Sequence, residues 1–153
     1  MNMQKGFTLI ELLVVIAIIG VLSTIVMSSL VSARQNGANA SIKSNMSSLR
    51  SQVELYNDIN NNYGTQANLC TTAGSVFVVD AKVAAMVAEI QKSAGVAPSC
   101  RSGPNPTTTW AVSGQLKGSP GGHWCIDSTG IVKLRTAVQG PVTAPPSSAG
   151  GGC

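Results

Sequence analysis

Few side chains in this sequence have the types and spacing that chemistry requires. The single histidine, His123, has only Asp127 nearby and no serine or cysteine pattern that would supply a nucleophile with its base. Asp127 is also the only acid after residue 90, which leaves too few oxygen ligands for a calcium cage. We therefore expect a protein that is not an enzyme and holds no metal or cofactor, with His123 in a turn or an edge strand.

The cysteines are the next candidates, and there are four: Cys70, Cys100, Cys125 and Cys153. No C-x-x-C or histidine-rich spacing accompanies them, so zinc is a poor fit. An even number of cysteines in an exported domain favours disulfides, in any of three connectivities. The alternative is a single pair, with Cys153 free on a mobile tail.

One acid lies where acids are costly. From Phe7 to Val31, Glu11 is the only charged residue, in a run longer than the ~20 residues that cross a hydrocarbon core as a helix. A carboxylate at the bilayer centre costs about 2.5 to 3.5 kcal/mol, and less near the interface. Lys5, just before the run, favours a cytoplasmic N-terminus and export of the remainder.

The helical pattern continues beyond the apolar run. Apolar residues recur at spacings of three and four at Ile42, Met46, Leu49, Val53 and Tyr56. No proline occurs before Pro98, and an Asn/Gly cluster at residues 58–64 is the first break. We expect one helix from about residue 8 to about residue 59, apolar all round in its first half and amphipathic in its second.

The rest of the chain predicts a second short helix and a sheet. Asp80 is a plausible N-cap and Gly95 a stop, with Val83, Val87, Ile90 and Ala94 on one face between them. Residues 109–116, 123–130 and 131–135 alternate apolar and polar side chains, and 127–130 suit a tight turn. The predicted fold is α+β: a long N-terminal helix packed on a small antiparallel sheet of at least three strands.

Charge adds little to the functional reading. Ten basic and six acidic residues give a formal net charge of +4, and the basic residues are scattered without a run. A solvated surface accounts for them better than a nucleic-acid footprint does. Contact with DNA is conceivable but unsupported.

Two segments resemble a known family. The stretch KGFTLIELLVVIAIIGVL at residues 5–22 resembles the class III signal of type IV pilins and type II secretion pseudopilins, and WCIDSTG at residues 124–130 resembles, less specifically, the last hairpin of small pilin-like proteins. The resemblance implies a type IV pilin-like fold and a subunit that polymerises into a filament. It also implies a prepilin peptidase that cuts between Gly6 and Phe7 and then methylates the Phe7 amine.

The same resemblance gives Glu11 a role. It implies that Glu11 faces the Phe7 amine of a neighbouring subunit, where breaking the pair would cost about 3 to 5 kcal/mol. The alternative is a Glu11 that is hydrated at the interface or satisfied by its own N-terminus. Packing would involve Leu9, Ile10, Leu13, Ile16 and Gly20, and many related pilins have a helix-kinking proline in this segment that the chain lacks.

The implied organisation is a leader (1–6), a transmembrane and assembly half-helix (7–31), a pilin-like globular domain (32–139) and a flexible Pro/Gly/Ser-rich tail (140–153). The precursor would sit in the inner membrane with its N-terminus cytoplasmic, and the filament would lie at the cell surface or in the periplasm. Implied partners are further copies of the chain, the prepilin peptidase, an inner-membrane platform protein and a cytoplasmic assembly ATPase.

Three alternatives remain. The first is a pseudopilin of a type II secretion system or competence pseudopilus, although many major pseudopilins bind calcium through a C-terminal acidic loop that this chain lacks. The second is a secreted domain released at Val31-Ser32-Ala33, which resembles a signal peptidase site. The third is a membrane-anchored binding domain that never polymerises.

Overall fold

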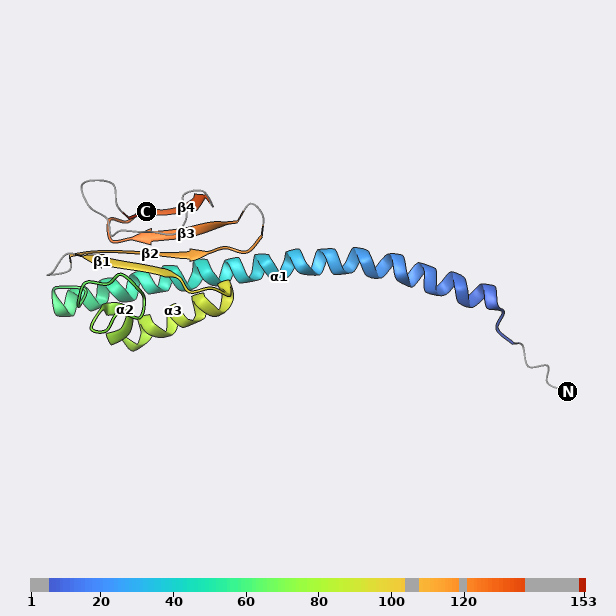
Figure 1. The fold of residues 1–153 in the computed structure, drawn as a ribbon, viewed down its shortest axis with the longest axis horizontal. Coiled ribbons are helices and arrows are strands. Elements are labelled where there is room, and N and C mark those ends of the chain that lie inside the picture. Colours follow the sequence, from blue (N-terminus) through green and yellow to red (C-terminus); the bar gives the residue numbers. More distant parts are fainter. Residues whose placement is uncertain (1–5, 104–107, 119–120, 137–151) are drawn as a thin grey trace. The chain divides into compact units, whose positions relative to one another are not determined.

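The computed structural model describes residues 6–103, 108–118, 121–136 and 152–153. The chain divides into two compact units, residues 1–34 and residues 35–153. Figure 1 labels three helices and four strands, and these form the predicted α+β arrangement. Leader residues 1–5 and tail residues 140–151 lie outside the described residues.

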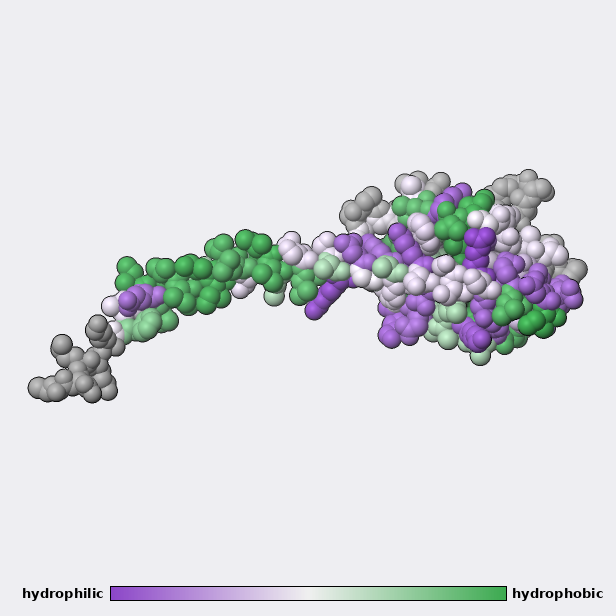
Figure 2. All heavy atoms as spheres, turned by 180° about the vertical axis from the view of Figure 1, so that it is seen from behind, coloured by the Kyte–Doolittle hydropathy of each residue, from purple (hydrophilic) through white to green (hydrophobic). Residues whose placement is uncertain are grey.

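Helix α1 (Leu9–Asn60) confirms the predicted long helix and passes through both units. In the first unit every described side chain is exposed, and Figure 2 shows an almost continuous apolar surface there. This part of α1 is long and apolar enough to cross a membrane. In the second unit α1 buries four side chains of the predicted stripe completely: Ile42, Met46, Leu49 and Val53.

The predicted second helix is α3 (Ala81–Ala94), and its caps are those expected from the sequence. The Asp80 carboxylate accepts the backbone N–H groups of Lys82 and Val83, and Gly95 adopts the left-handed φ of 78° that ends the helix. Burial raises the pKa of Asp80, but hydrogen bonds from Val83, Gln52 and Lys82 outweigh it and leave the pKa lowered. The Gln52 bond, at 3.0 Å, also ties α3 to α1.

The sheet is an antiparallel meander in the order β1-β2-β3-β4. Its strands are β1 (Ser99–Gly103), β2 (Thr109–Gln115), β3 (Gly122–Asp127) and β4 (Val132–Thr136). The three predicted strands are confirmed as β2, β3 and β4. Strand β1 and the short helix α2 (Val76–Val79) were not predicted, because Ser99–Gly103 has no apolar alternation and four apolar residues fit a strand as well as a helix.

The core of the second unit lies where α1 and α3 meet β2. At Gly114 a β-carbon would lie only 3.1 Å from Ile90, 3.2 Å from Ile42 and 3.3 Å from the Met46 sulfur. A glycine at this position therefore lets side chains of both helices pack directly on the strand. Cores packed at this density tolerate few added atoms.

Glu54 holds the far end of this core together. Its two carboxylate oxygens accept hydrogen bonds from the Trp110 indole N–H and the Tyr63 hydroxyl, each at 2.9 Å. The two rings also meet edge to face, with centroids 6.4 Å apart. Burial, together with the hydrogen bond to Glu54 and the charge of Glu54, raises the pKa of Tyr63 to about 12, so the phenol stays a donor.

Replacing Glu54 tests this anchor. Glu54→Ala leaves two buried donors without acceptors, and we expect it to lower the free energy of unfolding by about 2 to 4 kcal/mol. Glu54→Gln keeps one carbonyl acceptor and the side-chain volume, so its loss should be about 1 kcal/mol. Denaturant unfolding of the full chain in detergent, followed by tryptophan fluorescence, measures both. Equal losses for the two variants would contradict the anchor.

Candidate assembly site

The first turn of α1 is closed by a capping box between Thr8 and Glu11. The Glu11 Oε2 atom accepts the Thr8 backbone N–H at 2.9 Å and the Thr8 hydroxyl at 2.7 Å. The Thr8 Oγ1 atom in turn accepts the Glu11 backbone N–H at 3.3 Å. This reciprocal arrangement satisfies donors that a helix start leaves unpaired. Sequence reasoning missed Thr8, although the T-x-x-E spacing is the recognised signal.

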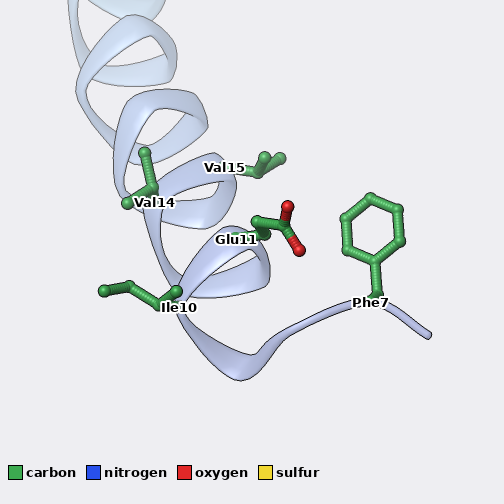
Figure 3. Close-up of a pocket in the computed structure, with 5 residues that line it drawn as sticks. All are labelled: Phe7, Ile10, Glu11, Val14 and Val15. Carbon is green, nitrogen blue, oxygen red and sulfur yellow. The ribbon is translucent and has the colours of Figure 1, made fainter. Parts of the chain in front are cut away.

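Glu11 is the polar member of a shallow hollow lined by Phe7, Ile10, Glu11, Val14 and Val15. In Figure 3 its carboxylate points toward the side of the helix on which the Phe7 ring lies. Only Oε2 is used in the capping box, and Oε1 accepts no hydrogen bond from the described residues. One carboxylate oxygen is therefore left in apolar surroundings, able to accept from an outside donor.

The predicted packing residues are all uncovered in the single chain. Their side chains remain exposed at 86% for Leu9, 70% for Ile10, 61% for Leu13 and 60% for Ile16. At Gly20 an added β-carbon would meet nothing within 4 Å, so no contact inside the chain requires a glycine there. Exposed apolar area on this scale needs lipid or other chains as its cover.

Three hydroxyls in the first unit donate to backbone carbonyls of the preceding helical turn. Ser23 donates to the Ile19 carbonyl at 2.7 Å, Thr24 to the Val21 carbonyl at 2.7 Å and Ser29 to the Ile25 carbonyl at 3.2 Å. Such back-bonding gives these three hydroxyl donors an acceptor in a hydrocarbon setting and bends helices slightly. At the opposite end, Gly6 is exposed and a β-carbon there would meet nothing within 4 Å.

The cysteines form two disulfides, Cys70–Cys100 and Cys125–Cys153. This is one of the three connectivities that the sequence left open. The alternative with Cys153 free is wrong. The loop that carries Cys70 runs beside β1, where Ala67 pairs with Ser102, and this places Cys70 next to Cys100.

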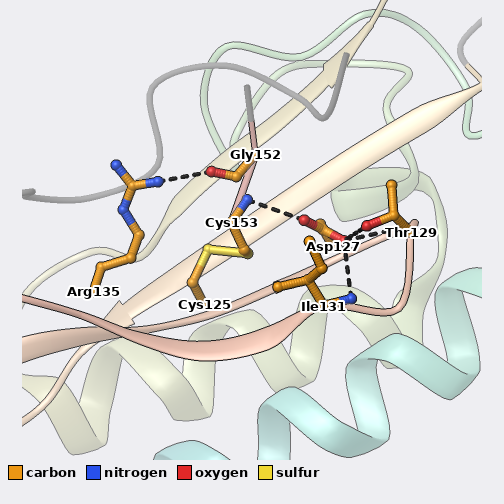
Figure 4. Close-up of a disulfide and its surroundings, with 7 residues drawn as sticks. All are labelled: Cys125, Asp127, Thr129, Ile131, Arg135, Gly152 and Cys153. Carbon is orange, nitrogen blue, oxygen red and sulfur yellow. Dashed lines mark hydrogen bonds between the residues drawn. A yellow bond between two sulfur atoms is a disulfide. The ribbon is translucent and has the colours of Figure 1, made fainter. Parts of the chain in front are cut away.

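Cys153 is held on the sheet by more than its disulfide. Its backbone N–H donates to Asp127 Oδ2 at 3.0 Å, while Asp127 Oδ1 accepts the backbone N–H groups of Thr129 and Ile131 and the Thr129 hydroxyl. Arg135 donates to the Gly152 carbonyl at 2.7 Å, as Figure 4 shows. Asp127 is therefore a buried structural carboxylate that closes the predicted turn and anchors Cys153.

His123 lies on β3, which pairs with both β2 and β4. The expectation of a turn or an edge strand is therefore wrong. His123 is opposite Arg135 in the register, and burial followed by the Arg135 charge lowers the pKa of His123. Among the described residues, no three histidine, cysteine or acidic side chains gather as metal ligands.

Comparisons with known proteins bear on this geometry. Residues 1–27 match the family model described as the prokaryotic N-terminal methylation motif. The type II secretion system core protein G of Klebsiella pneumoniae is 30% identical over 83% of this chain and 83% of its own length. The core protein G of Dickeya chrysanthemi is 37% identical over 40% of each chain. The type IV wide pilus major component PilA4 of Thermus thermophilus is 38% identical over 41% of this chain.

The last two matches cover 40% and 48% of the relatives' own lengths, so they span less than half of those proteins. No solved structure matches the chain. A methylation motif on an apolar helix that continues into an α+β unit defines a prepilin-type protein. Because the Klebsiella match extends over most of both chains, this chain belongs to the family of type IV pilins and type II secretion pseudopilins.

Removing the Cys125–Cys153 disulfide should destabilise the second unit, residues 35–153, which we call the head. The bridge joins residues 28 apart, and loss of a native disulfide of this kind costs about 2 to 4 kcal/mol, mainly by freeing the unfolded chain. We expect Cys125→Ser/Cys153→Ser to lose this amount in denaturant unfolding. The matched control is Cys70→Ser/Cys100→Ser, whose bridge spans a separation of 30. Unchanged stability in the first variant would show that Asp127 and Arg135 hold Cys153 without the bridge.

Proposed function

We propose that this chain is the subunit of a type IV pilus-like filament and polymerises after leader cleavage and N-methylation. The observation that carries the proposal is Glu11, a carboxylate with one unused oxygen in the part of α1 whose apolar side chains are uncovered. A lone charge in such surroundings is costly and marks a functional site. A partner that supplies both a cation and apolar cover removes both costs together.

A second copy of the chain supplies both. Cleavage between Gly6 and Phe7 converts the Phe7 amide into a cationic amine, and methylation keeps its charge. The unused Oε1 of Glu11 accepts a hydrogen bond from that amine of a neighbouring subunit, while the exposed leucines and isoleucines of both helices pack together. Attraction between the two charges is strong in a medium of low dielectric, and an offset register leaves both unpaired.

The machinery follows from this proposal. The precursor sits in the inner membrane with its N-terminus in the cytoplasm and is processed there by a prepilin peptidase. A platform protein and an assembly ATPase then drive extraction of residues 7–31 from lipid into the filament. The uncovered Gly20 would permit close helix contact or local loosening of α1 during that step.

A pseudopilin is the second candidate, and the relatives favour it. The relative that matches most of the chain is named as a type II secretion core protein. For the pilus, the supporting observation is Asp127: the only acid after residue 90 is fully occupied by hydrogen-bond donors and cannot contribute to a calcium loop. Surface fibres of the wild-type chain would favour the pilus, and short periplasmic filaments the pseudopilus.

Glu11→Gln separates the assembly role of Glu11 from its capping role. Glutamine can also close a capping box, so the helix start should survive while the negative charge is lost. We expect normal processing and membrane insertion but no sheared filaments from cells in which this is the sole subunit. Thr8→Ala is the matched control, because it removes the cap and keeps the charge.

The opposite result is equally clear. Filaments from Glu11→Gln together with loss of filaments from Thr8→Ala would mean that Glu11 acts only as a cap. The proposal of an intersubunit charge pair would then be wrong. Filament yield by shearing and electron microscopy, with immunoblots for membrane protein, measures both variants.

Gly6→Val tests the proposed cleavage site. A branched side chain next to the scissile bond blocks close approach of peptidase groups, so the leader should stay attached. Intact-mass measurement of membrane protein should show the unprocessed chain, whereas the wild type should start at methylated Phe7. Gly20→Ala is the control and should be processed normally. A Gly6→Val chain that starts at Phe7 would contradict the site.

A further inference from the structure

A basic hollow lies between α1 and the last two strands of the sheet, within the second unit. It encloses about 210 Å³. Its walls are Lys43, Ser47 and Arg50 from α1, Trp124 and Ile126 from β3, and Val132 from β4. On this face β4 remains poorly covered, since Val132 is 47% exposed and Leu134 is 54% exposed. The hollow thus combines cations with apolar surface.

In the part of the chain that the structure describes, the two cations have no acidic partner. The Lys43 ammonium lies 4.5 Å from the centre of the Trp124 ring, and Arg50 donates to the Gly130 carbonyl at a long 3.4 Å. Among the described residues, neither forms an ion pair. Such a site favours a carboxylate flanked by apolar side chains, because it can satisfy the charges and cover the exposed valine and leucine together.

The chain itself carries one such group. Of its six acids, Glu54, Asp80 and Asp127 hold the fold through hydrogen bonds, Glu89 pairs with Lys92 at 3.3 Å, and Glu11 lies in the apolar helix. The sixth, Asp58, is exposed, and its carboxylate forms no hydrogen bond or ion pair with any residue that the structure describes.

Apolar side chains flank Asp58 on the same helix. Leu55 is 48% exposed and lies three residues before Asp58, at the helical spacing that makes the two side chains neighbours. Ile59 is 71% exposed and lies four residues after Leu55, so the two apolar side chains share one face of α1 next to Asp58. We call Leu55, Asp58 and Ile59 the acidic knob. Its chemistry is that which the basic hollow favours: one negative charge next to two exposed apolar side chains.

We propose that the basic hollow of one subunit receives the acidic knob of a second copy. This inference rests on the proposed function, because it assigns a contact between heads within the filament. The two surfaces differ, so the contact is heterologous. Repeating such a contact generates an open helical assembly and not a closed dimer. Asp58 would lie between Lys43 and Arg50, which are two turns apart on α1 and about 10 Å from each other along its axis.

Zero-length crosslinking of wild-type filaments tests the contact. A carbodiimide joins a carboxylate to an amine only when the two touch, and Lys43 and Asp58 are about 22 Å apart along the same helix. A Lys43–Asp58 crosslink therefore reports two chains. We expect it as the main crosslink of Asp58 in sheared filaments. Filaments in which Asp58 joins another lysine, or none, would overturn the inference, whereas absence of any filament would overturn the proposed function instead.

Charge exchange gives a second measurement. Asp58→Lys places three cations together, and we expect filament yield to fall at least about tenfold with processing unchanged. Lys43→Glu should lower the yield in the same way. The double variant Lys43→Glu/Asp58→Lys should recover most of the wild-type yield. Glu89→Lys, an exposed acid on α3, is the matched control and should leave yield unchanged. Failure of the double variant to recover yield would overturn the pairing.

Discussion

Apolar side chains without cover in the first unit are the constraint on which the rest of the structure depends. A soluble helix hides such residues against its own domain, but every described side chain up to Arg34 is exposed. Several polar side chains in this segment are satisfied locally, by back-bonded hydroxyls at Ser23 and Ser29 and by the Thr8–Glu11 box. The segment therefore suits lipid and, equally, a bundle of like helices. In both surroundings Glu11 is the only charged side chain between Phe7 and Val31, and it needs a partner of opposite charge.

In the second unit the same helix, α1, is part of a packed core. Here α1 contributes a buried stripe, and α3 and β2 close over it at Gly114. Three carboxylates hold this unit together through hydrogen bonds. Glu54 joins α1 to the sheet, Asp80 joins α3 to α1, and Asp127 holds Cys153. These three carboxylates are occupied by hydrogen bonds within the fold, and Lys43 and Arg50 of the basic hollow form no ion pair among the described residues.

Local signals predicted local structure well. The period of the Ile42 to Val53 stripe located α1, and the cap chemistry of Asp80 and Gly95 located α3, because both depend on neighbours in sequence. Strand β1 could not be seen, since its pairing with β2 gives order to a segment with no apolar pattern. The placement of His123 was wrong for a related reason: the sequence does not say which strands lie inside a sheet. The disulfide connectivity could not be predicted either, because it also depends on which segments lie side by side in the fold.

The meander order of the sheet has a consequence for how the head folds. Each strand pairs with the strand just before it in the chain, across short connections. Closing a short loop costs little entropy, and folds rich in such neighbouring contacts tend to form quickly. The sheet can therefore grow strand by strand on α1 as the chain emerges, and at no stage does a strand have to wait for a distant partner.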